Sequence, residues 1–213
     1  MGNFRIIFGI FTFMGLLLFS CNTSQEKKID ETTQNEQKEA LTWVVFDAGF
    51  DEMRLPIFFP PDEGIQVPYK SISSKLIATL FSKKPFEWAM GLERDVPNLS
   101  EHSDSATKFS AIGKTYTKDS NVVYAILKKK DGINDFYYYL ITTTKTGEYI
   151  SGMCLSFLEG DNENSLGRTA SINTDLSIEI AQSEYSKGKR STPQTAFFEI
   201  DHKGKINAIK RQQ

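Results

Sequence analysis

The feature that most constrains the fold is a succession of short β-type runs, separated by turn residues, between residues 107 and 210. Connectors such as "KDSN", "TKTGE" and "DHKGK" contain glycine or asparagine, which supply the positive φ angles of tight hairpins. Short connectors favour antiparallel pairing, because a parallel return needs a dozen or more residues. The sequence therefore predicts an antiparallel β meander. Its strands are expected at about 107–116, 121–130, 135–145, 148–158, 168–173, 175–184, 194–201 and 205–210.

One helix is expected before the meander. The segment "SISSKLIATLFSK" (71–83) has apolar residues at helical spacing, Ser73 or Ser74 as a candidate N-cap, and Pro85 as its stop. The runs at 41–48 and 55–59 are rich in branched and aromatic residues and are typical of strands. The predicted fold class is mainly β, of the α+β kind. We expect about eight to ten strands in a curved sheet or partial barrel, with the helix near 73–83 packed on it.

The strand within "DFYYYLITTT" is predicted to be central, because alternation gives it apolar surface on both faces. In the next strand, alternation places Cys154 on the face opposite Met153, Leu155 and Phe157. We interpret Cys154 as a buried, inert thiol, since free cysteine behaves as a small hydrophobe. A nucleophilic role would need a histidine partner, and His102 and His202 both fall in predicted loops or turns.

The amino terminus has the pattern of an export signal. Arg5 precedes an apolar run of 14 residues, Ile6–Phe19, which suits a signal peptide and is shorter than the roughly 20 residues of a spanning helix. The following "LFSC" (18–21) resembles the lipobox of bacterial lipoproteins, with Phe19 bulkier than the usual residue there. The resemblance implies diacylglyceryl transfer to the sulfur of Cys21, cleavage before Cys21, and acylation of the new amino terminus. The alternatives are an uncleaved signal anchor and N-myristoylation at "MGN", for which Ile6 stands where Ser or Thr is wanted.

Residues 22–40 are predicted to be a disordered tether, because Ile29 is their single large aliphatic side chain. As a random coil they would hold a domain about 25 Å from the lipid, and at most about 65 Å when stretched. The alternative is a helix, which would lack an apolar face. The expected organisation is a signal peptide at 1–20, the lipidated cysteine and tether at 21–40, and a β domain at 41–213.

Charge and composition exclude several function classes. The chain has 25 basic and 27 acidic residues, so no positive excess attracts nucleic acid. Removal of Arg5 with the signal leaves 24 basic residues against 27 acidic, and this net charge does not draw the domain to an anionic bilayer. Two cysteines and two well-separated histidines cannot supply a disulfide framework or a structural zinc site. No cofactor is expected.

The body of the chain also carries a family-like pattern. "YYYLITTTKTGEYISGMCLS", then "TASINTDLSIEI", then "FFEIDHKGKINAI" resemble a succession found in Bacteroidota lipoproteins of unknown function. The resemblance covers about residues 106–210 and implies an antiparallel β domain. It lends no catalytic residues.

Candidate sites are few, and each has a structural alternative. Three acidic residues near Trp43 and Phe50 could supply the paired carboxylates of a hydrolase. The loop at 159–164 offers oxygen ligands for calcium, with a solvated hairpin loop as the alternative. Three aromatic residues could line a ligand surface, with core packing as the alternative. The residues are Asp47, Asp51 and Glu52 for the hydrolase, Asp161 and Glu163 for the metal, and Trp43, Phe50 and Trp88 for the aromatic surface.

The predicted function follows mainly from the amino terminus. We expect a lipid-anchored protein of the cell envelope, at the outer membrane, that binds an envelope protein or a glycan. No nucleophile elbow, P-loop, HExxH or dinucleotide fingerprint is present in the sequence. The alternatives are an inhibitor or immunity-type protein, and the carboxylate-dependent hydrolase.

Overall fold

The computed structural model describes residues 41–61, 70–86, 99–100, 106–130, 135–160 and 164–209. The chain divides into two units, Met1–Leu41 and Thr42–Gln213, and the second holds all the strands and helix α2. The predicted signal peptide, Cys21 and the whole of the predicted tether lie outside the described residues. No helix in the described ranges is long and apolar enough to cross a membrane.

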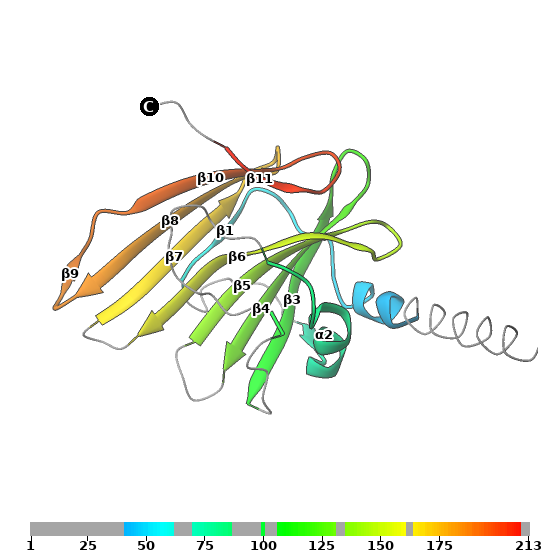
Figure 1. Ribbon diagram of the computed structural model, residues 1–213, viewed down its shortest axis with the longest axis horizontal. Helices are drawn as coiled ribbons and strands as arrows, with labels where there is room; N and C mark the ends of the chain where they lie inside the picture. The colour runs from blue at the N-terminus through cyan, green and yellow to red at the C-terminus, as the bar shows by residue number, and fades with distance from the viewer. Residues whose placement is uncertain are drawn as a thin grey trace, which may run out of the picture. The chain divides into compact units, whose positions relative to one another are not determined.

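The described residues form one antiparallel sheet of eleven strands (Figure 1). The sheet order is β11-β10-β8-β7-β6-β5-β4-β3-β2, with β1 added beside β7 and β9 beside β8. The predicted mainly β, antiparallel fold is confirmed. The bounds are β1 (Ile57–Phe59), β2 (Lys70–Ile72), β3 (Thr107–Tyr116), β4 (Val122–Lys130), β5 (Asp135–Thr143), β6 (Tyr149–Gly160), β7 (Asn164–Ile172), β8 (Ser177–Ser186), β9 (Lys189–Arg190), β10 (Gln194–Ile200) and β11 (Ile206–Ala208).

Two helical segments pack on the sheet. The predicted helix is present as α2 (Ser74–Phe81), which begins after Ser73. The prediction of a strand at 41–48 is wrong, because residues 42–47 are helical. Trp43 and Phe46 lie on the buried side of this segment, and the ring centroid of each is within 5.5 Å of that of Tyr124 in β4. Aromatic packing on the sheet therefore overrides the β preference of a branched run.

Two hydrophobic clusters form the core, one on each side of the central strand β5. Tyr138 and Leu140 belong to the first cluster, which joins β4–β6 to β7, β8, β10 and β11. Tyr139 and Ile141 belong to the second, which α2 and the segment after Thr42 cover. The central position predicted for this strand is thus confirmed. The largest fully buried aromatic side chains of the two clusters are Tyr124, Tyr138, Tyr139, Phe46, Phe59, Phe81, Phe109 and Phe157.

The sheet forks between β6 and β7. These strands pair only from Phe157↔Arg168 to Gly160↔Ser165. Beyond Arg168, β7 pairs instead with β1, whose Phe59 lies opposite Ala170. Figure 1 shows β1 entering between β6 and β7. The first strand of the domain thus fills a gap in a sheet made mostly of later residues.

A β-bulge lies in β6 next to the fork. Tyr138 pairs with Ser156 and Tyr139 pairs with Cys154, so Leu155 has no opposite residue on β5. A bulge of this kind reverses the alternation of side chains. Phe157 therefore joins Cys154 in the second cluster, while Met153 and Leu155 lie in the first. The expectation that Phe157 shares the face of Met153 and Leu155 is wrong for this reason.

The sheet is open but strongly curved. The hairpin between β10 and β11 meets the hairpin between β3 and β4, although these strands are far apart in the sheet order. The main-chain oxygen of His202 accepts hydrogen bonds from Thr117 Oγ1 at 3.0 Å and Asn121 Nδ2 at 3.1 Å. Side chains, and not strand pairing, therefore hold the two hairpins together.

The turn between β5 and β6 gives a test of how the first helical segment is held. Gly147 has a φ of +91°, and an added Cβ would lie only 2.3 Å from ring carbons of Trp43. Gly188 has a φ of +75°, but nothing lies near its Cβ position. Gly188→Ala should therefore cost only backbone strain, about 1–2 kcal/mol. We expect Gly147→Ala to lower the free energy of unfolding in urea by clearly more, and equal losses would contradict this packing.

Candidate functional site

A row of paired side chains crosses the sheet at the fork. Register aligns Lys128 of β4 with Tyr137 of β5, Tyr137 with Phe157 of β6, Phe157 with Arg168 of β7, and Arg168 with Gln182 of β8. The rings of Tyr137 and Phe157 are stacked with centroids 6.1 Å apart, and the Arg168 guanidinium carbon lies 4.8 Å from the Phe157 centroid. The row thus combines aromatic stacking with a cation–π contact.

Arg168 is the most unusual residue of the row, because its side chain is charged and the residue is only 2% exposed. Its Nε and Nη2 donate to Gln182 Oε1 at 3.1 and 2.8 Å, and Nη1 donates to the Cys154 main-chain oxygen at 3.3 Å. Both acceptors are neutral. Among the described residues, no carboxylate forms an ion pair with Arg168.

Arg168 lies between the two hydrophobic clusters, and this place decides the electrostatics of its guanidinium. On the same face of β7, Leu166 belongs to the second cluster and Ala170 to the first. Burial lowers the pKa of the Arg168 guanidinium, and the nearby Cys154 and Glu159 act in the opposite direction. A guanidinium stays charged under such conditions. The fork therefore holds a buried positive charge that is stabilised by dipoles and an aromatic ring.

The hydrogen bonds of Arg168 and Ser156 explain how the fork closes. The Cys154 carbonyl belongs to the part of β6 that β7 does not pair with, and Arg168 Nη1 satisfies it. The Ser156 hydroxyl lies within hydrogen-bond distance of two main-chain oxygens, 2.6 Å from that of Pro60 and 2.5 Å from that of Arg168. These side chains replace the missing ladder bonds, because a buried carbonyl without a partner is costly.

Replacement of Arg168 tests this role. Arg168→Met should lower the free energy of unfolding by about 2–4 kcal/mol, because Gln182 Oε1 and the Cys154 carbonyl lose their donors. Arg54→Met, at an exposed position before β1, is the matched control and should change it by less than about 0.5 kcal/mol. The double variant Arg168→Met, Gln182→Met should recover part of the loss, since it removes one orphaned acceptor. No loss in the single variant would rule out the role in closing the fork.

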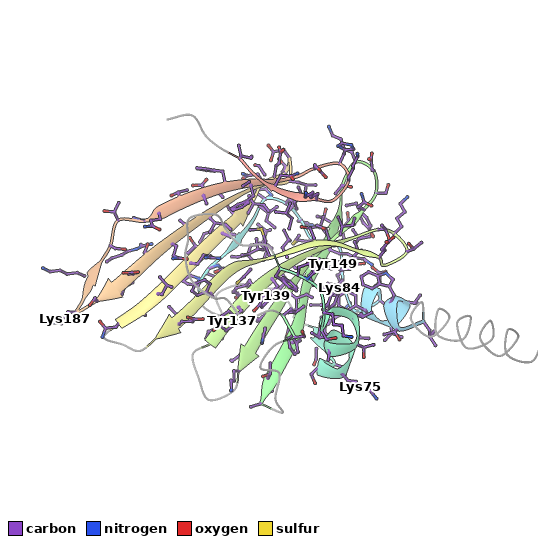
Figure 2. All side chains as sticks on the ribbon, in the orientation of Figure 1. Lys75, Lys84, Tyr137, Tyr139, Tyr149 and Lys187 are labelled. Atoms are coloured by element: carbon purple, nitrogen blue, oxygen red, sulfur yellow. The ribbon has the colours of Figure 1, made fainter. Side chains whose placement is uncertain are left out.

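A second aromatic group continues from the row toward α2. The Phe86 centroid lies 5.6 Å from that of Tyr139 and 6.2 Å from that of Tyr149, and Lys84 Nζ lies 5.8 Å from the Tyr149 centroid. Tyr149 Oη also donates a hydrogen bond to the Pro85 main-chain oxygen. Figure 2 shows Tyr137, Tyr139 and Tyr149 along the middle of the sheet, with Lys84 beside Tyr149. These contacts fix the chain that leaves α2 against β5 and β6.

A third group joins the first helical segment to the sheet. Asp47 Oδ1 accepts hydrogen bonds from Lys114 Nζ at 2.6 Å and from Tyr124 Oη at 2.7 Å. Burial alone would raise the pKa of Asp47, but these two hydrogen bonds and the Lys114 charge lower it below its ordinary value. Burial, and then the bond to Asp47, raise the pKa of Tyr124 well above its ordinary value. Asp47 therefore stays ionised and Tyr124 neutral.

This arrangement predicts a pH-dependent contribution to stability. A carboxylate with a lowered folded-state pKa stabilises the fold above its ordinary pKa of 3.8, and the contribution is lost as the pH falls through the folded-state value. Asp47→Asn should therefore destabilise the protein at pH 7, and the difference from the unmodified protein should shrink below pH 3.8. Urea unfolding at several pH values measures this. Asp51→Asn, which removes an exposed ion pair with Lys70, should have little effect at pH 7.

The residues proposed from sequence lie in different places. Trp43 and Phe50 are 7% and 4% exposed and belong to the second cluster, as the core-packing alternative expects. Asp47 pairs with Lys114 of β3, Asp51 pairs with Lys70 of β2, and Glu52 forms an isolated β-bridge with Lys114. In the described residues, no group of three or more His, Cys, Asp or Glu is placed to hold a metal ion. Trp88, His102, Asp161 and Glu163 lie outside the described residues.

Cys154 and Arg168 show what sequence reasoning found and what it missed. Cys154 is a buried free thiol, and burial raises its pKa to about 12. Arg168 was not anticipated. The available signal was its position between Leu166 and Ala170, two residues away on either side, which puts it on the apolar face of a strand.

The comparisons with known proteins give no further assignment: no family model, curated protein or solved structure matches this chain.

Proposed function

We propose that this chain is a lipid-anchored protein of the cell envelope, at the outer membrane, whose β domain acts as a binding module. The observation that carries the proposal is the sequence around Cys21. An apolar run of signal-peptide length ends in "LFSC", and a polar segment follows to residue 40. A cysteine that carries several acyl chains gives lasting attachment, because one chain anchors only marginally.

The position of the folded unit supports the same arrangement. The unit with the sheet begins at Thr42, so about 20 residues separate it from Cys21. A segment of this length and composition is suited to a spacer between a lipid and a domain. As a binding module, the domain would bind an envelope protein or a glycan.

The geometry favours binding over the hydrolase alternative. A glycosidase-type mechanism needs one carboxyl group that stays protonated and a second that stays ionised. The pKa of Asp47 is lowered, so it is a poor general acid, and its carboxylate already accepts two hydrogen bonds. Asp51 is held by Lys70 at 2.5 Å. Asp47 and Asp51, two of the three candidate acids, therefore have structural partners that account for their positions.

Metabolic labelling tests the anchor. Cells that express the protein and grow with labelled palmitate should incorporate the label, and Cys21→Ser should abolish both the label and membrane fractionation. Cys154→Ser is the matched control, because this thiol is buried in the sheet and should leave the label unchanged. Label that persists in Cys21→Ser would overturn the proposal.

A further inference from the structure

The outer sides of the two helical segments form an exposed surface, which we call the two-helix surface. It comprises Val44 and Val45 of the first segment and Lys75, Lys83 and Lys84 in and just after α2. Both segments bury their opposite sides in the second cluster, where the Phe46 and Phe81 centroids are 5.4 Å apart. The exposed sides therefore point away from the same face of the sheet.

The first part of the two-helix surface is apolar. Val44 and Val45 are 61% and 59% exposed, while Trp43 and Phe46 on the other side of the same segment are buried. Two neighbouring branched side chains in water gain free energy when an apolar phase covers them. They are among the most exposed large hydrophobic residues described in the domain.

The second part is basic. Residues 70–86 contain four lysines and no acidic residue. Lys75, Lys83 and Lys84 are exposed, although Lys84 Nζ also lies over the Tyr149 ring, and Figure 2 shows Lys75 and Lys84 on either side of α2. Two of the three acids of the adjoining segment are paired, Asp47 with Lys114 and Asp51 with Lys70, while Glu52 is exposed. Positive charge is thus concentrated here, although the chain as a whole has a formal charge of −2.

Apolar side chains flanked by lysines are suited to a membrane interface. The aliphatic groups enter the boundary of the acyl chains, and the ammonium groups attract anionic headgroups over about one Debye length. The location agrees with this partner, because the chain between Cys21 and Thr42 enters the domain at the segment that carries Val44 and Val45. A lipid on Cys21 would keep this surface close to a bilayer.

We propose that the two-helix surface docks on a bilayer with anionic headgroups, so that the lipid anchor and this surface together orient the β domain. The proposal rests on the lipid anchor proposed above. Docking would leave the opposite end of the sheet, with the β8–β9 hairpin, directed away from the lipid. Figure 2 shows Lys187 of that hairpin at the far end from α2.

Lysine footprinting on the full lipidated protein provides the test. The protein is added to preformed vesicles of phosphatidylethanolamine with phosphatidylglycerol, or of phosphatidylcholine alone, and brief acetylation is read at each lysine by mass spectrometry. Lys75, Lys83 and Lys84 should react at least about fivefold more slowly on the anionic vesicles, a factor that corresponds to the attraction expected for one lysine. Lys187 and Lys189 are internal controls and should react equally on both.

Two variants separate the contributions. Val44→Asn with Val45→Asn should reduce the protection of the three lysines while the protein still sediments with the vesicles. Thr195→Asn, at an exposed position of β10, is the matched control and should leave the protection unchanged. Protection that is equal on both vesicle types, or absent from sedimented protein, would overturn the docking and leave the anchor intact. Failure to sediment with either vesicle would instead overturn the anchor and, with it, the docking.

Discussion

The fold depends on how the sheet tolerates a fork between β6 and β7. Along one side, β7 pairs first with β6 and then with β1. The Arg168 guanidinium donates to Gln182 on β8 and to the Cys154 carbonyl on β6, and so bridges the gap. A neutral side chain of similar length could not donate in both directions with the same fixed geometry. The fork in turn admits β1, whose Phe59 packs on Tyr138 at 5.7 Å between ring centroids. The first core cluster therefore depends on a buried charge.

The opposite side of the sheet depends on a polar contact of another kind. Asp47 ties the first helical segment to Lys114 and Tyr124, beside the bulge between Ala111 and Gly113 in β3. That bulge brings the Lys114 amide into hydrogen-bond reach of the Asp51 main-chain oxygen, at 2.8 Å. Segment 51–53 and β2 then both lie along β3, so the outer edge of this long strand is covered. Covered edges resist pairing with other chains.

Local patterns predicted most of the elements, and long-range contacts account for the rest. Hairpin turns predicted the strands after residue 106, and helical spacing predicted α2, because these signals lie within a few residues of one another. The helical segment at 42–47 was missed, since its branched run has β preference and only the packing of Trp43 on Tyr124 reveals a helix. The fork was missed because it joins residues 57–59 to 170–172. The bulge at Leu155 was missed because regular alternation assumes an unbroken ladder.

The same distinction applies to the candidate functional surfaces. The formal net charge of the whole chain is negative, and a negative chain is not attracted to an anionic bilayer. Folding redistributes that charge, because Asp47 and Asp51 turn toward Lys114 and Lys70, while Lys75, Lys83 and Lys84 stay exposed beside α2. A surface is recognised over about a Debye length, roughly 10 Å, and not over the whole molecule. Local charge beside exposed valines is therefore the relevant quantity for a domain that a short tether holds near lipid.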